Sequence, residues 1–255
     1  MSAPVALITG ASRGIGKQLA VDLAANGWDV VCAARSSSDH PSKLPGTIDE
    51  TAELVRAKGR RAIAAPLDVR DEDAVKELAD RISTELGRCD LLINNAAIAP
   101  PLPALQDSTK RWRLAVDINV NGPFYLCYYL CPRMPVGAGR VINVSSGAVT
   151  FPEFGRPSYT ATKAALEGLT DGLAFELRGK VAVNTLRLDL TVWSEGFSDT
   201  LGPESGVPFE DPVIMTDAVL WMLKQPIDFS GKTLVVSELR AQGIVRPETR
   251  WKRGA

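Results

Sequence analysis

The chain has 255 residues but only one histidine, His40, which stands in a polar stretch. We therefore do not expect a serine–histidine–aspartate triad or a histidine-based metal cluster. No apolar run approaches the roughly 18–20 residues that a membrane-spanning helix needs. The first residues lack a basic segment followed by an apolar one, so we expect neither a membrane span nor a secretory signal.

The sequence also has few cysteines and almost no net charge. The four cysteines are too few for a disulfide framework, and Cys127 and Cys131 stand four residues apart with no second pair of ligands nearby. Because 29 basic residues balance 30 acidic ones, electrostatics give no reason to expect binding to nucleic acid or to an anionic membrane. We expect a cytoplasmic protein with reduced thiols and no metal site.

What the sequence does contain is a regular alternation of short apolar runs and helical patterns. Buried strands are predicted at 5–9, 30–34, 62–67, 91–94, 140–144, 181–186 and 233–236. Helices are predicted at 15–26, 49–58, 71–86, 108–131, 158–177 and 213–224. Such alternation indicates right-handed βαβ units. We predict an α/β fold, a single doubly wound Rossmann-type domain over residues 1–255, with a parallel seven-stranded sheet and helices on both faces.

A glycine-rich turn joins the first strand to the first helix. Its sequence, TGASRGIG at 9–16, places glycine at positions 10, 14 and 16. Glycines there allow a tight turn and bring backbone N–H groups close to a phosphate at the helix N-terminus. The spacing differs from the standard G-x-G-x-x-G fingerprint, and such turns also serve close packing or other cofactors. Its place after the first of several strand–helix units favours a dinucleotide.

The end of the second strand should decide which dinucleotide binds. An NAD site has an acidic residue about 20 residues after the glycines, where it accepts a hydrogen bond from the ribose 2′-hydroxyl. Here the strand ends in Arg35, and the nearby acid, Asp29, stands at its start. Arg35 can pair with a 2′-phosphate and Arg13 adds a second cation, unless both are simply solvated. We predict NADP(H), with NAD(H) less favoured, and Asp68 as an acceptor for the adenine amine.

A second group of polar residues follows the fifth predicted strand. Ser145 and Ser146 end that strand, and Tyr159 and Lys163 stand four residues apart on the next helix, where they share one face. A phenol whose ionised form is stabilised by an ammonium group can act as a general base near neutral pH. Such pairs also arise by chance, and serines after strands are commonly caps. The nucleotide site is what favours the catalytic interpretation.

Together these motifs resemble the short-chain dehydrogenase/reductase family over nearly the whole chain. The matching segments are TGASRGIG at 9–16, LDV at 67–69, NNAA at 94–97, NVNG at 119–122, VSS at 144–146 and YTATK at 159–163. KLPGTI at 43–48 and SGKTLVVSE at 230–238 are most similar to hydroxysteroid dehydrogenase-like members. The resemblance implies a nicotinamide cofactor and a homodimer or homotetramer formed through helices 108–131 and 158–177.

The resemblance also implies the residues of the site. The catalytic set would be Asn119, Ser146, Tyr159 and Lys163, with Ser146 preferred because the family's serine lies thirteen residues before the tyrosine. Tyr159 would be the general acid or base, with Lys163 supporting it and binding the nicotinamide ribose. Ser146 would hold the substrate oxygen, and Asn119 would bend its helix and hold a water. The implied cofactor contacts are Gly10, Ser12, Arg13, Gly14, Ile15, Gly16, Arg35, Asp68, Val69, Asn95, Ala96, Ala97, Tyr159, Lys163, Leu188 and Thr191.

Two positions depart from the family pattern. Ala97 replaces a glycine beside the cofactor, which we expect to be tolerated. Leu188-Asp189 replaces the usual proline–glycine after the sixth strand, beside the nicotinamide ring. Aspartate adopts a positive φ less readily than glycine, so we expect this turn to differ. Asp189 could then place a carboxylate near the ring or the substrate.

Glycine and proline punctuate the segment 188–212, which we expect to be a lid over the substrate. Its apolar side chains, with those before Tyr159, indicate a mainly apolar substrate, unless they only anchor the lid. The expected pocket residues are Val149, Phe154, Asp189, Trp193 and Phe197.

The function predicted from these features is that of an NADP-dependent oxidoreductase. It would interconvert a carbonyl compound (a ketone or aldehyde) and an alcohol by hydride transfer, with Tyr159 as general acid or base. The alternative is an NADP(H)-binding sensor or scaffold with little or no turnover, which Leu188-Asp189 motivates. A methyltransferase is less favoured, because it would leave Tyr159 and Lys163 without a role.

Overall fold

A seven-stranded parallel sheet forms the centre of the chain. The computed structural model describes residues 2–100, 103, 105–151, 155–201 and 208–251. The strand order is β3-β2-β1-β4-β5-β6-β7, so the direction of winding reverses between β1 and β4. The strands are β1 (Val5–Thr9), β2 (Asp29–Ala34), β3 (Ala62–Pro66), β4 (Leu91–Asn94), β5 (Gly139–Ser146), β6 (Val181–Leu188) and β7 (Thr233–Val235).

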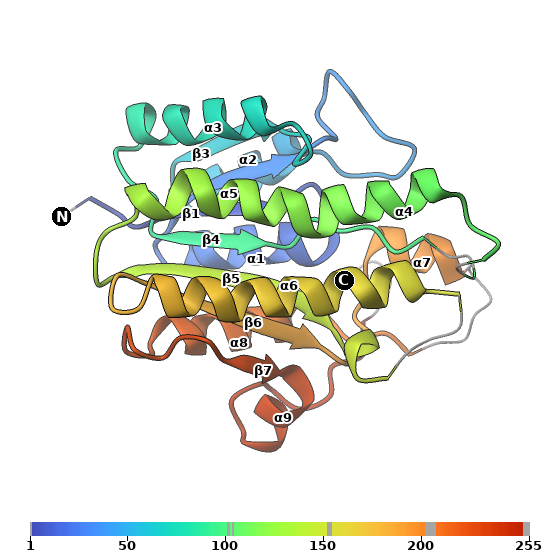
Figure 1. Ribbon diagram of the computed structural model, residues 1–255. Coiled ribbons are helices and arrows are strands. Elements are labelled where there is room, and N and C mark those ends of the chain that lie inside the picture. Colours follow the sequence, from blue (N-terminus) through green and yellow to red (C-terminus); the bar gives the residue numbers. More distant parts are fainter. Residues whose placement is uncertain (1, 101–102, 104, 152–154, 202–207, 252–255) are drawn as a thin grey trace.

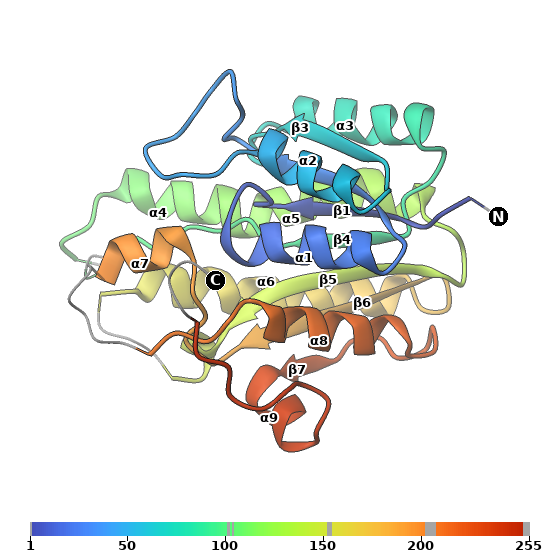
Figure 2. The same ribbon diagram turned by 180° about the vertical axis from the view of Figure 1, so that it is seen from behind.

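Helices cover both faces of this sheet. In Figure 1, α3, α4, α5 and α6 lie on the viewer's side, and Figure 2 shows α1, α2 and α8 across the other face. Their bounds are α1 (Gly14–Ala25), α2 (Ile48–Ala57), α3 (Glu72–Glu85), α4 (Thr109–Val116), α5 (Gly122–Leu130), α6 (Pro157–Glu176) and α8 (Val213–Leu223). The predicted doubly wound, parallel seven-stranded architecture is confirmed. No helix in the described ranges is long and apolar enough to cross a membrane.

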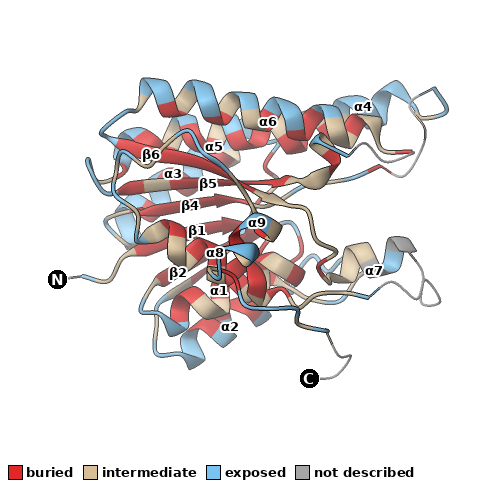
Figure 3. Cartoon of the chain, turned by 90° about the horizontal axis from the view of Figure 1, so that it is seen from below, coloured by how far each residue is buried: buried red, intermediate tan, exposed pale blue. Residues whose placement is uncertain are grey.

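The sheet is buried between two apolar layers, as the red strands of Figure 3 show. On one side Ile8 and Ile93 pack with residues of α1 and α8, and on the other side Leu7 and Leu92 pack with residues of α3 and α5. All four side chains are fully buried. This explains why these strands appear in the sequence as continuous apolar runs: a parallel sheet covered on both faces has no polar face.

A row of polar side chains crosses the sheet on the α6 side. Asn94 and Asn143 are register partners of β4 and β5, and Asn143 and Thr185 are register partners of β5 and β6. Asn94 Nδ2 donates to Asn143 Oδ1 at 2.8 Å. Thr170 of α6 accepts from Asn143 Nδ2 at 2.8 Å and from Thr185 Oγ1 at 3.0 Å. Such hydrogen bonds offset the free-energy cost of burying polar groups in an otherwise apolar layer.

Local sequence determines where several helices begin. Thr47 and Glu50 form a reciprocal capping box at the start of α2. Asp71 accepts from the third residue of α3 at 3.0 Å, and Ser108 accepts from Arg111 N of α4 at 3.3 Å. These side chains satisfy amides that have no partner within the helix.

The structure differs from the predicted elements in three places. The helix predicted over 108–131 is interrupted by a π-helical turn, Asp117–Asn121, which separates α4 from α5. A short helix, α7 (Glu195–Leu201), lies within the predicted lid, and another, α9 (Val236–Ala241), follows β7 directly. Both are too short for a periodic pattern to identify.

Candidate functional site

The glycine turn is built around a close approach of Gly16 to Gly10. A Cβ on Gly16 would lie 2.3 Å from the Gly10 carbonyl oxygen, so no side chain fits there. Asn95 Nδ2 donates to the Thr9 carbonyl at 2.9 Å, and Thr9 Oγ1 accepts from the backbone amides of Asn95 and Ala96. These bonds fix the turn after β4 against the end of β1, where the winding reverses. Ligands of doubly wound sheets bind at this position.

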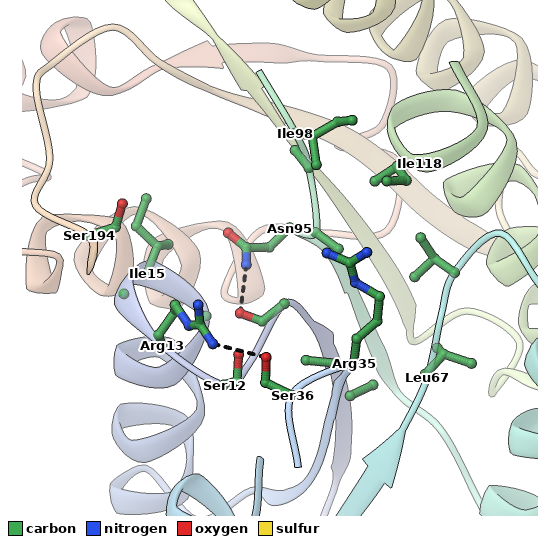
Figure 4. A pocket seen from close by; sticks show the side chains of 18 of the residues that line it. Ser12, Arg13, Ile15, Arg35, Ser36, Leu67, Asn95, Ile98, Ile118 and Ser194 are labelled. Carbon is green, nitrogen blue, oxygen red and sulfur yellow. Dashed lines mark hydrogen bonds between the residues drawn. The ribbon is translucent and has the colours of Figure 1, made fainter. Parts of the chain in front are cut away.

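A cavity of about 320 Å³ opens at this point (Figure 4). Its wall contains every cofactor contact that was expected from the glycine turn, from Arg35, from Asp68-Val69 and from Asn95 to Ala97. The expected cofactor contacts did not include the remaining lining residues, which are Ala33, Ala34, Ser36, Leu67, Ile98, Ile118 and Ser194.

The two arginines of this cavity have different surroundings. Arg35 is exposed and extends across the cavity from the end of β2. Arg13 was expected to be a second cation for a phosphate, but its Nη2 donates to Ser36 Oγ at 2.9 Å, to Ser42 Oγ at 2.6 Å and to the Gly46 carbonyl at 3.2 Å. The segment between β2 and α2 therefore folds back onto the glycine turn. Arg13 Nε is buried without a hydrogen-bond partner in the described part of the chain.

Asp68, expected to accept from the adenine amine, is already paired. Its carboxylate accepts from Arg70 Nε at 3.0 and 3.1 Å and from Nη2 at 2.5 Å. These hydrogen bonds, stronger than the opposing effect of burial, hold the pKa of Asp68 below its usual value. Asp68 therefore stays ionised in the cavity wall, with its negative charge balanced by Arg70.

A second cavity, of about 560 Å³, adjoins the first. The two share the wall residues Ile15, Asn95, Ala97, Ile98 and Ser194. Ser146, Tyr159 and Lys163 line the second cavity together with Leu188 and Thr191. The fold thus brings three of the four expected catalytic side chains to one space beside the glycine-turn cavity.

Lys163 is almost fully buried, with 2% of its surface exposed. Its Nζ donates to the Val144 carbonyl at 2.7 Å and lies 5.6 Å from the centroid of the Tyr159 ring. Burial disfavours the charged amine and lowers the pKa of Lys163 to about 8, although the carboxylate of Glu167 opposes this effect. The ammonium group of Lys163 therefore loses its proton more easily than that of an exposed lysine.

The fourth expected catalytic residue, Asn119, lies in the π-helical turn. Its Oδ1 accepts from Ile98 N at 2.9 Å, and its Nδ2 donates at 2.9 Å both to the Ile98 carbonyl and to Thr162 Oγ1. Asn119 thus joins the turn after β4 to the helix that carries Tyr159 and Lys163. Helical bulges of this type are frequent at functional sites.

The adjacent serines of β5 point in opposite directions, as strand geometry requires. Ser145 Oγ donates to Glu167 Oε1 of α6 at 2.7 Å. Ser146 Oγ accepts from Ala148 N at 3.2 Å and lines the second cavity. Ser145 lines the same cavity, but its hydroxyl is bound to Glu167, so the choice of Ser146 as the catalytic serine stays a prediction.

The turn at Leu188-Asp189 proceeds without a left-handed residue, since every positive φ among the described residues belongs to a glycine. Asp189 Oδ1 accepts from Ser237 N at 3.0 Å, and Oδ2 accepts from the Ser237 hydroxyl. Asp189 lines the second cavity as expected, but its carboxylate is bound to the start of α9 and is not free to face a ligand.

The other expected pocket residues fare differently. Phe197 lines the second cavity, whereas Val149 and Trp193 are not part of its wall. The Trp193 ring stacks on Trp251 with centroids 4.1 Å apart and planes 8° apart, so it anchors the lid. Phe154 lies outside the described residues.

Sequence reasoning missed the role of Glu210. Its backbone bonds to Thr191 and Trp193, and its carboxylate accepts from Arg240 at 2.7 and 3.0 Å and from Thr249 N at 2.9 Å. Glu210 thereby joins the predicted lid to α9 and to the C-terminal segment. No local pattern marks this role, because its partners are 30 and 39 residues away.

The cysteines and the potential metal ligands of the described ranges lie apart from the two cavities or from one another. The four cysteines are buried and free, and burial raises the pKa of Cys32 and of Cys89 to about 12. The described residues contain no cluster of histidine, cysteine, aspartate or glutamate that could hold a metal ion.

Comparison with known proteins places this geometry in context. Residues 4–192 match the family profile described as short chain dehydrogenase. Hydroxysteroid dehydrogenase-like protein 2 of Danio rerio is 34% identical over 242 residues, which cover 93% of this chain and 58% of the relative. The chain thus spans little more than half the length of that relative.

Solved structures share the fold over nearly the full chain. A short chain dehydrogenase from Mycobacterium thermoresistibile has a TM-score of 0.84 and 29% identity, covering 95% of this chain and 88% of its own. A short chain dehydrogenase from Burkholderia cenocepacia J2315 in complex with NADP has a TM-score of 0.80 and 27% identity, covering 92% and 96%.

Proposed function

The chain belongs to the short-chain dehydrogenase/reductase family of oxidoreductases, and we propose that it is an NADP-dependent member that interconverts a carbonyl compound and an alcohol. The observation that carries this proposal is the adjacency of the two cavities, one lined by the glycine turn and the other by Ser146, Tyr159 and Lys163. A nucleotide in the first cavity would meet a substrate in the second across their shared wall.

The residues of the first cavity fit a dinucleotide. The turn at Gly10 and Gly16 leaves no room for a Cβ, as expected where backbone amides must approach a phosphate. Asn95 to Ala97 would lie along the cofactor, and Tyr159, Lys163, Leu188 and Thr191 would contact its nicotinamide end. When bound, NADP supplies the hydride acceptor or donor.

The proton transfers fall to the chain's own side chains. Tyr159 would give a proton to the carbonyl oxygen in reduction and take one from the alcohol in oxidation. A protonated Lys163 near the ring favours the phenolate by electrostatic attraction. The hydroxyl of Ser146 would orient the substrate oxygen, and Asn119 would hold the π turn and Ile98 in place.

Removing the phenol hydroxyl tests this chemistry. A panel of carbonyl compounds, from short aldehydes to steroid-sized ketones, is screened for NADPH consumption with wild type, Tyr159→Phe and Tyr128→Phe. We expect Tyr159→Phe to lose activity by about 100-fold or more, the usual contribution of a general acid. Tyr128, which is exposed on α5, serves as the control for loss of a phenol hydroxyl. Wild-type turnover in Tyr159→Phe would contradict the mechanism.

The NADP preference is supported by charge at the end of β2. Arg35 extends into the cavity, and Asp29 is held at the far end of the strand by Arg60 and Arg61. A guanidinium suits a 2′-phosphate, whereas NAD sites place a carboxylate there. Arg35→Asp should weaken NADPH binding much more than NADH binding in a fluorescence titration, with exposed Arg81→Asp as control. Equal losses for both cofactors would reject the assignment.

The turn at Leu188-Asp189 favours a second candidate, an NADP(H)-binding sensor or scaffold. The family's proline–glycine is replaced by a residue whose carboxylate is bound to Ser237. Tight NADPH binding without hydride transfer to any compound of the panel would support this alternative.

We also propose a mainly apolar substrate, a cytoplasmic location and a homodimer or homotetramer. Phe151 and Phe197 line the second cavity, and these aromatic side chains support an apolar substrate. Free cysteines agree with a reducing compartment. Trp112, Phe124 and Tyr128 are exposed along α4 and α5, which supports self-association through this face. Light scattering of the purified protein measures the oligomeric state.

A further inference from the structure

One partly buried carboxylate, Glu167, joins the two strand ends that form the proposed active site. Ser145 and Arg187 are register partners of β5 and β6, and both side chains point to the same α6 residue. Glu167 Oε1 accepts from Ser145 Oγ at 2.7 Å and from Arg187 Nε at 3.0 Å, and Oε2 accepts from Arg187 Nη2 at 2.6 Å. A single side chain thus fixes both strands at the same level.

The next register pair along these strands lines the second cavity. It consists of Ser146 and Leu188, whose side chains point away from Glu167 because neighbouring strand residues face opposite sides. A shift of the backbone at Ser145 or Arg187 would therefore displace Ser146 or Leu188. Glu167 is bound to the two residues that directly precede those expected to hold the substrate oxygen and the nicotinamide ring.

The same carboxylate lies one helical turn after Lys163. Lys163 donates to the Val144 carbonyl and Glu167 accepts from Ser145, so α6 is attached to two successive residues of β5. Burial lowers the pKa of Lys163, and Glu167 is the charge that opposes this effect. The charged or titratable groups around Lys163 include Tyr159 and Glu167 on α6, and Arg156, which lines the same cavity from the start of that helix. Asp117, Arg187 and Asp189 lie on the neighbouring elements. Arg187 is bound to Glu167 itself, Asp117 to Asn121 and Asp189 to Ser237.

We propose that Glu167 is a positioning residue of the active site, which aligns Ser146 through Ser145 and places a negative charge one helical turn from Lys163. The catalytic part of this proposal rests on the function proposed above. The charge part concerns the folded protein alone and is testable without a substrate.

The experiment measures the protonation of Lys163 directly. Competitive labelling with acetic anhydride between pH 6 and 11, followed by mass spectrometry of the peptide containing Lys163, gives the midpoint at which this amine becomes reactive. In wild type we expect a midpoint near pH 8. Glu167→Gln keeps an acceptor for Ser145 but removes the negative charge, so the midpoint should fall by about one pH unit.

The structure offers a matched control in Glu210→Gln. The Glu210–Arg240 pair has side-chain exposures of 12% and 20%, close to the 13% and 16% of Glu167–Arg187. Both variants should destabilise the protein similarly, but only Glu167→Gln should move the Lys163 midpoint. An unchanged midpoint in Glu167→Gln, or an equal shift in Glu210→Gln, overturns the proposal. If Glu167→Gln does not fold, the double variant Glu167→Gln/Arg187→Gln leaves no charge unpaired; it should lower the midpoint in the same direction but by less, because the Arg187 cation is removed as well.

Measurements of kcat against pH separate the two roles of Glu167, which are the alignment of Ser146 and the effect of its charge on Lys163. With NADPH and a carbonyl compound that wild type reduces, kcat of Glu167→Gln should approach the wild-type value at pH 6, where Lys163 is protonated in both. It should fall below wild type as the pH rises. Glu167→Ala also loses the bond to Ser145, so its kcat should be reduced at every pH, whereas kcat equal to that of Glu167→Gln would reject the alignment of Ser146. If wild type reduces no carbonyl compound, the proposed function fails, while the labelling midpoints still decide the role of the Glu167 charge.

Discussion

Replacing Asn119 by alanine should show how strongly the site depends on the π-helical turn. Asn119 is 1% exposed and makes three side-chain hydrogen bonds, two to the backbone of Ile98 and one to Thr162. Each such bond contributes about 0.5–1.5 kcal/mol net, so Asn119→Ala should lower the free energy of unfolding by about 3 kcal/mol. For a chain of this size that corresponds to a fall in Tm of roughly 6–12 °C.

Asn121 provides a control on the same turn. Its Nδ2 donates to Asp117 Oδ1 at 2.9 Å, a single bond between residues four apart on one helix. Such pairs contribute only about 0.2–0.5 kcal/mol, so Asn121→Ala should lower Tm by less than about 2 °C. Differential scanning calorimetry of both variants measures the difference, and an NADPH titration should show weaker binding in Asn119→Ala because Ile98 lines both cavities. Equal Tm values for the two variants would refute the assignment of Asn119 as the link between β4 and α6.

Two further substitutions test other parts of the site. In Gly16→Ala the new Cβ would lie 2.3 Å from the Gly10 carbonyl oxygen, so NADPH binding should weaken about tenfold or more in a fluorescence titration. Gly172→Ala, which has no atom within 4 Å of the new Cβ, should leave the affinity unchanged. Similar affinities in the two variants would mean that the glycine turn does not bind the cofactor. Trp251→Ala removes a ring stack of about 1 kcal/mol, so the lid should be cleaved about fivefold faster in limited proteolysis. A rate equal to that of the surface control Leu54→Ala, on α2, would contradict the anchoring of the lid.

The sheet and its family were predictable from the sequence for a physical reason. Strands covered on both faces must be mainly apolar, and each is separated from the next by a helix long enough to show its period. The motif at 9–16 and the pair Tyr159–Lys163 lie at the ends of such strands or at the starts of the helices that follow them. Their neighbourhood in space therefore followed from the order of the elements.

What could not be predicted depends on contacts between distant segments. Arg13 binds Ser42, 29 residues away, and Asp189 binds Ser237, 48 residues away. Trp193 looks like a pocket residue by its position in the lid, but its partner Trp251 lies at the end of the described chain. Residue type and spacing can indicate that a side chain is buried, but they do not specify which distant side chain it contacts.

The row formed by Asn94, Asn143 and Thr185 has a consequence for how accurately the sheet assembles. A slip of β5 by one residue would turn Asn143 to the opposite face and displace Ser146 by about 3.3 Å along the strand. Each polar group left without a partner would cost about 1–3 kcal/mol, a penalty that exchanging one aliphatic side chain for another would not impose. Mispaired chains are thereby disfavoured before any ligand is present. The alignment of the residues that end β5 and β6 is then decided while the chain folds.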